Sequence, residues 1–144
     1  MDFNHNLISY RNLTLMLTYR CNAQCKDCGT FSSPHDKNDI SLETALLSIT
    51  WAKECGLNQV VFTGGEATLR WDDLLKSIAH ATNLGMSTRL VTNAQWAGSA
   101  EAASDGIREL QKTGLGEINF STGDEHVRFI PLENVLFAIS AALH

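Results

Sequence analysis

The chain has 144 residues, enough for one domain with a real core, and its 44% hydrophobic and 19% charged residues are ordinary for a globular protein. The net charge of -5 argues against a nucleic-acid partner, because phosphate binding needs a basic surface. No apolar run approaches the roughly 20 residues of a membrane span, and the opening Met-Asp-Phe-Asn-His lacks the features of a signal peptide. We therefore expect a cytoplasmic protein with no membrane partner.

Short apolar strands alternate with amphipathic helices along the chain. The strands are rich in β-branched residues and are expected at positions 13–18, 59–63, 87–92 and 117–121. Helices are expected from about Ser41, a good N-cap, from about Trp71, over positions 101–112, and from Pro131, a natural first helical position. Such alternation predicts an α/β fold with parallel strands and right-handed crossovers.

Helical spacing also predicts which side of each helix is buried. In the first helix, the apolar residues on one face are Leu42, Ala45, Leu46, Ile49 and Ala52. In the fourth helix, the apolar residues at helical spacing are Leu132, Val135, Leu136, Ile139 and Leu143. We expect both stripes to face the core.

Three glycines mark a repeat in the sequence. Gly56, Gly85 and Gly114 stand 29 positions apart, and each precedes an apolar residue and an expected strand. Glycine there fits the left-handed residue that ends many helices, and about 30 residues is the size of a βαβ step. We therefore expect about four parallel βα units, with residues 1–144 forming one partial (β/α) barrel domain. It is expected to be truncated at its C-terminus, with a native four-unit half barrel as the alternative. Open sheet edges would favour a homo-oligomer.

Three of the four cysteines fall within eight residues. Cys21, Cys25 and Cys28 follow the first strand with the spacing Cys-x3-Cys-x2-Cys, which in a reducing compartment indicates metal binding rather than disulfides. A [4Fe–4S] cluster would take three thiolates from this loop and keep one iron open for a substrate. A zinc site that adds His35 is the alternative. The fourth cysteine, Cys55, is expected to be a small packed residue.

Polar residues also follow the second and third strands, where parallel α/β folds bind ligands. After the second strand, Gly64 and Gly65 would let the backbone approach a ligand closely, and Glu66 would add an acceptor for an ammonium group. A plain strand–helix turn is the alternative interpretation. After the third strand, Asn93 is placed to line the same cavity.

The cysteine motif and the following Gly-Gly-Glu resemble the two signature elements of the radical S-adenosylmethionine (SAM) superfamily, and the resemblance runs from about Leu13 to the C-terminus. It implies a cluster on the three cysteines, SAM chelated by the open iron, and contact of the Gly-Gly-Glu loop with the SAM amino group. Two positions depart from the family pattern. Asp27 stands where an aromatic residue often lies against the adenine, and Ala67 stands where proline is frequent.

The resemblance extends to the segment after the fourth strand. In relatives, a polar residue there touches the SAM ribose or carboxylate, which here points first to Ser121 and then to Asp124. The string from Ser121 to Glu133, which includes His126, resembles a segment common in members that modify peptides or proteins.

The activity implied by the resemblance is that of an oxidoreductase. SAM would be cleaved reductively to a 5′-deoxyadenosyl radical that abstracts hydrogen from a substrate, here expected to be a peptide or protein. An electron donor such as a flavodoxin or ferredoxin is also implied. The resemblance implies that the cluster and SAM carry out the chemistry without a further catalytic residue. Two alternatives stay open: a short activase that makes a glycyl radical on a partner, and a non-catalytic zinc module using the three cysteines and His35.

Overall fold

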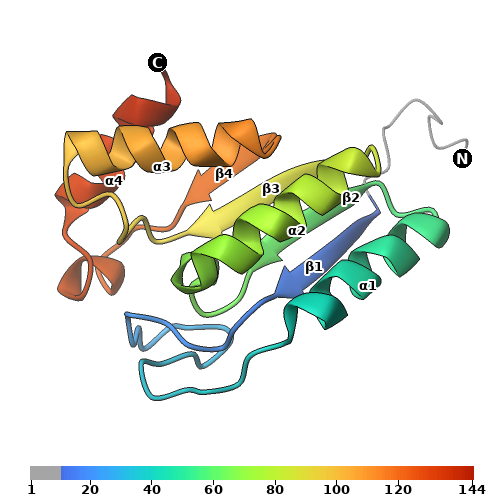
Figure 1. The fold of residues 1–144 in the computed structure, drawn as a ribbon. Coiled ribbons are helices and arrows are strands. Elements are labelled where there is room, and N and C mark those ends of the chain that lie inside the picture. Colours follow the sequence, from blue (N-terminus) through green and yellow to red (C-terminus); the bar gives the residue numbers. More distant parts are fainter. Residues whose placement is uncertain (1–10) are drawn as a thin grey trace, which may run out of the picture.

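Strands and helices alternate along residues 11–144, the part of the chain that the computed structural model describes; the first ten residues of the predicted domain lie outside it. The order is β1 (Asn12–Met16), α1 (Leu42–Glu54), β2 (Gln59–Thr63), the short 3-10 helix η1 (Ala67–Arg70), α2 (Trp71–Asn83), β3 (Ser87–Thr92), α3 (Ala100–Lys112), β4 (Glu117–Phe120), the short 3-10 helix η2 (His126–Arg128) and α4 (Leu132–Ala142). The strands form one parallel sheet in the order β1-β2-β3-β4 (Figure 1). The predicted α/β fold with four parallel βα units is confirmed.

The outer strands are shorter than predicted. The bounds of β2 and β3 are those expected, but β1 ends at Met16, because Thr18 and Arg20 pair with Asp39 and Ser33 in the returning part of the following loop. At the other edge, β4 ends at Phe120. The chain therefore leaves β1 early and builds a long irregular loop before α1.

The ends of the helices follow from local chemistry. Ser41 caps α1, and its side chain accepts a 3.0 Å hydrogen bond from the Thr44 N–H. At the other end, the N–H groups of Gly56 and Leu57 donate back to Lys53 and to Ala52, both at 2.9 Å, which is the Schellman arrangement. The same pattern closes α2 and α3, so the predicted 29-residue repeat is confirmed. Among residues 11–144, no helix has the length and apolar character needed to cross a membrane.

The two faces of the sheet have different surroundings. Alternate strand residues such as Leu15, Phe62 and Leu90 point into the main core, which α1 and α2 cover (Figure 1). On the opposite face, Val61 and Arg89 are only half-buried. The sheet has β1 and β4 as its open edges.

The face that α4 buries shares only Val135 with the predicted one. Val135 is 4% exposed and Asn134 and Ala138 are buried beside it, whereas Leu136 is 55% and Leu143 is 78% exposed. Of the predicted stripe, Val135 faces the core as expected, whereas the expectation is wrong for its exposed members Leu132, Leu136, Ile139 and Leu143. The cluster that α4 joins contains three buried small residues, Ala94, Ala97 and Ala103, with Trp96 and Phe120 packed against it. Close approach there suits Ala138, and Asn134 Nδ2 adds a 3.1 Å bond to the Gln95 carbonyl.

The prediction for Cys55 is also wrong. Its side chain is exposed rather than packed. Cys55 is the C-cap residue of α1, directly before the turn at Gly56. A helix end that turns at the surface has no neighbouring element to bury it.

Candidate functional site

The three cysteines lie on the loop between β1 and α1, residues 17–40, which we call the cysteine loop. Its outgoing and returning arms are joined by backbone hydrogen bonds, including Tyr19 N to Asn38 O at 2.9 Å and Cys21 N to Ser33 O at 3.1 Å. At its tip, the Cys28 N–H donates to the Cys25 carbonyl at 3.3 Å. The loop is thus folded back on itself, although it forms almost no regular secondary structure.

An open cavity of about 220 Å³ lies at the C-terminal ends of the strands. Its wall brings together nearly all the residues selected from the sequence: Cys21, Cys25, Cys28, Gly64, Gly65, Glu66, Asn93 and Ser121. Asp27 and His126 line it as well. Asp124 is exposed and lies outside this wall, and so does the exposed His35. The cavity therefore gathers the residues expected at the strand ends, with the exception of Asp124.

The two glycines after β2 lie directly against the cysteine loop. A Cβ on Gly64 would stand 2.5 Å from the Thr18 carbonyl oxygen, and one on Gly65 would overlap the Arg20 carbonyl. The N–H groups of Gly65 and Glu66 donate to those same two carbonyls, each at 2.8 Å. We expected these glycines to allow approach to a ligand, and the structure gives them a second reason, the close contact of two loops.

Glu66 is tied into the protein by its carboxylate and is only 2% exposed. One oxygen accepts from the Thr92 hydroxyl at 2.8 Å and from the Thr68 hydroxyl and N–H, and the other accepts from the Asn93 N–H at 2.8 Å. Burial raises the pKa of Glu66, and these hydrogen bonds oppose that shift. Four donors fill most of the carboxylate's acceptor capacity. With its carboxylate so engaged, Glu66 has little acceptor capacity left for a ligand.

Asn93 connects the end of β3 to the cysteine loop. Its Nδ2 donates to Asn22 Oδ1 at 2.7 Å and lies 3.8 Å from the Cys21 sulfur, while its Oδ1 accepts from Gln95 N at 3.0 Å. Asn22 was not selected from the sequence, since nothing in the cysteine spacing distinguishes it. Its own Nδ2 is buried and has no hydrogen-bond partner in the described residues. The Asn22 atom that lies 3.9 Å from the Cys21 sulfur is Oδ1, so this buried donor is left without an acceptor among the described residues.

The three thiols differ in how readily they ionise. Burial raises the pKa of Cys21, and burial together with the neighbouring Asp27 charge raises the pKa of Cys25. At Cys28, burial by itself would also raise the pKa. The Thr30 hydroxyl, 3.3 Å away, and nearby backbone N–H groups have the larger effect, and they lower the pKa of Cys28. The thiolate is the form of cysteine that binds metals, and Cys28 is the cysteine of this loop that ionises to it most readily.

The arrangement of donors bears on which metal group would fit. In residues 11–144, no three His, Cys, Asp or Glu side chains are gathered so that they could hold one metal ion. Zinc needs its donors within about 2.0–2.3 Å of a single point, whereas each thiolate of a [4Fe–4S] cluster binds a different iron. All three cysteines line the cavity, and three is the number of thiolates that a [4Fe–4S] cluster with one open iron would take from the protein.

The segment after β4 contributes a contact that sequence reasoning missed. Glu125 Oε2 accepts from the Lys26 N–H of the cysteine loop at 3.2 Å, and Arg128 pairs with the same carboxylate at 2.9 Å. These donors lower the pKa of Glu125. No sequence signal separates Glu125 from its neighbour Asp124.

The sequence matches no protein-family model, so an assignment of function rests on the site.

Proposed function

We propose that this chain forms a radical SAM core, with a [4Fe–4S] cluster on Cys21, Cys25 and Cys28 and SAM bound in the same cavity. The observation that carries the proposal is the shared cavity wall, in which the three thiols face the backbone of Gly64 and Gly65 at the C-terminal ends of parallel strands. The open four-stranded sheet is then part of a (β/α) barrel. This arrangement supports the enzyme over a zinc-stabilised binding module.

The residues of the chain hold, orient and shield the reacting groups. When bound, the reduced cluster would supply one electron that cleaves SAM to methionine and a 5′-deoxyadenosyl radical able to take hydrogen from a substrate. The glycine backbone would orient the SAM amino group, and Asn93 would hold the loop beside Cys21. Glu66 keeps the ends of β2 and β3 together without touching the reaction.

The substrate side of the site is the sheet face that no described helix covers. Thr63 and Val91 line the cavity and belong to the strands of this face. Ser121 and His126, from the segment that resembles peptide-modifying relatives, also line it. We therefore propose a peptide or protein substrate, with a flavodoxin or ferredoxin as the electron donor.

Anaerobic reconstitution tests the metal group. The purified chain, the three single Cys→Ala variants at positions 21, 25 and 28, and the control Cys55→Ala would be loaded with iron and sulfide. We expect a brown protein with about four iron and four sulfide per chain, retained by Cys55→Ala and lost by the other three. A colourless protein that holds one zinc would contradict the proposal.

The activity is tested on the loaded protein. With a strong reductant and SAM, we expect 5′-deoxyadenosine and methionine in equal amounts, measured by chromatography. A fully loaded cluster whose electron paramagnetic resonance (EPR) spectrum does not change on adding SAM would contradict SAM binding in this cavity.

A further inference from the structure

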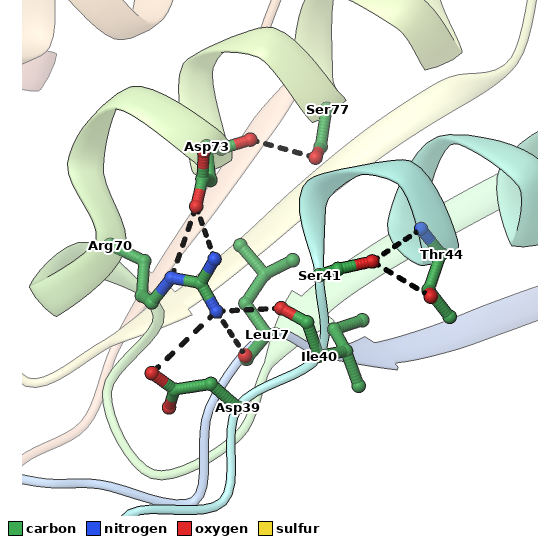
Figure 2. A network of polar contacts seen from close by, with 8 residues as sticks. All are labelled: Leu17, Asp39, Ile40, Ser41, Thr44, Arg70, Asp73 and Ser77. Carbon is green, nitrogen blue, oxygen red and sulfur yellow. Dashed lines mark hydrogen bonds and ion pairs between the residues drawn. The ribbon is translucent and has the colours of Figure 1, made fainter.

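Arg70 reaches the base of the cysteine loop from the segment that follows the Gly-Gly-Glu turn (Figure 2). Its Nη1 donates to the Leu17 carbonyl at 3.2 Å and to the Ile40 carbonyl at 2.7 Å. Leu17 stands where the chain leaves β1, and Ile40 stands directly before the Ser41 cap of α1. One nitrogen therefore bonds both ends of the loop that carries the three thiols.

Two carboxylates hold the guanidinium in this position. Asp73, in the first turn of α2, accepts from Nε at 3.1 Å and also from Nη2, and Asp39 Oδ2 lies 3.7 Å from Nη1 (Figure 2). The Arg70 side chain is 17% exposed. A mostly buried guanidinium with charge-assisted bonds on two sides has little freedom to turn, so Nη1 stays directed at the two carbonyls.

The neighbouring segment strengthens the same connection. Gly65 and Glu66 donate to the carbonyls of Thr18 and Arg20. Residues 65–70 thus supply donors to both the outgoing arm of the cysteine loop and its return. Arg70 does not line the cavity, so any effect it has on a bound group must pass through the loop.

We propose that Arg70 is a positioning residue that closes the base of the cysteine loop and so holds the thiols at the cavity before any metal group arrives. The closure is a property of the metal-free chain. Its consequence for cluster binding rests on the proposed function. Arginine suits the task because its planar fork can satisfy carbonyls and carboxylates at once, whereas a lysine ammonium is a point charge on a flexible stem.

The first test measures loop closure without any metal. Arg70→Met keeps a long side chain but removes the charge, Arg70→Lys restores the charge, and Arg108→Met removes an exposed arginine that pairs three residues back with Asp105. In hydrogen exchange of the metal-free proteins, we expect amides in residues 18–40 of Arg70→Met to exchange on the order of tenfold faster, with α3 unchanged. Arg70→Lys should lie between it and the wild type, and Arg108→Met should match the wild type.

A uniform rise in exchange across the chain, or no rise in residues 18–40, would overturn the proposal. If Arg70→Met does not fold by circular dichroism, the folded Arg70→Lys and Asp39→Asn variants carry the test, because each leaves the Asp73 partner in place. Both should open residues 18–40 selectively, Arg70→Lys more than Asp39→Asn.

The second test measures retention of the metal group. After anaerobic loading, we expect a chelator to remove iron from Arg70→Met several-fold faster than from the wild type, with Arg108→Met unchanged. The EPR spectrum of the reduced Arg70→Met cluster should be broader. Equal iron loss despite an opened loop would overturn the positioning role. A wild-type chain that takes up no cluster would instead overturn the proposed function, and the exchange result would stand separately.

Discussion

The side-chain amide of Asn93 donates a 2.7 Å hydrogen bond to the side-chain oxygen of Asn22, joining the end of β3 to the cysteine loop. The backbone N–H of Asn93 donates to Glu66 at 2.8 Å. One residue therefore connects three strand ends around the cavity, and its removal should loosen all of them.

Asn93→Ala should destabilise the chain and weaken its hold on the proposed cluster. The substitution leaves the Asn22 oxygen and the Gln95 N–H without their partner, so we expect a loss of about 1–3 kcal/mol in the free energy of unfolding. Urea unfolding measures the first effect, and the rate of iron loss to a chelator measures the second. Asn119→Ala, at an exposed position on β4, is the matched control and should change neither.

Gly65→Ala should be far more damaging than Gly98→Ala. The added methyl group at position 65 would overlap the Arg20 carbonyl, whereas nothing lies within 4 Å of the corresponding position at Gly98. We expect Gly65→Ala to lose about 3 kcal/mol or more and Gly98→Ala to stay within about 0.5 kcal/mol of the wild type. Equal midpoints of urea unfolding for the two variants would contradict the close contact between the loops.

Paired substitutions in α4 test which face is buried. Val135→Ala should cost about 1–3 kcal/mol because it removes buried methyl groups. Leu136→Gln changes a side chain that is mostly exposed and should stay within about 0.5 kcal/mol. The reverse order in urea unfolding would contradict the burial of Val135 and the exposure of Leu136.

Glu66 should give the metal-free chain a distinct pH dependence. Because the pKa of Glu66 is raised above its ordinary value of 4.5, the folded chain binds this proton more tightly than the unfolded chain. The stabilisation is fully present below the unfolded pKa and is lost as the pH rises through the folded pKa. Relative to Glu66→Gln, which cannot titrate, the wild type should lose stability as the pH rises above the ordinary carboxyl pKa of 4.5. Urea unfolding across this range measures it; a difference that rises with pH would contradict the prediction.

Local sequence patterns predicted where the helices and strands of the molecule lie. The cap at Ser41 and the glycine at position 56 depend on the few residues around them, so the bounds of α1 could be inferred directly. The cavity at the strand ends followed from parallel topology, which places the cysteines near Gly64 and Asn93.

Contacts set by tertiary packing could not be predicted in this way. The buried face of α4 depends on the small residues opposite it, and these compete with a stripe of larger apolar side chains. The role of Arg70 depends on carbonyl groups, which every residue carries and which leave no trace in the sequence. Likewise, Glu125 was missed in favour of Asp124 because only the path of the loop distinguishes them.

The contacts around the cysteine loop also set an order of events during synthesis. Asn93 and Glu125 contact this loop across 71 and 99 positions of the chain. A nascent chain that has emerged only as far as α2 already carries all three thiols but neither of these partners. Stable metal insertion should therefore follow completion of β4, because non-local contacts form late. A metal group would then be held stably only by chains whose four-stranded sheet has already formed.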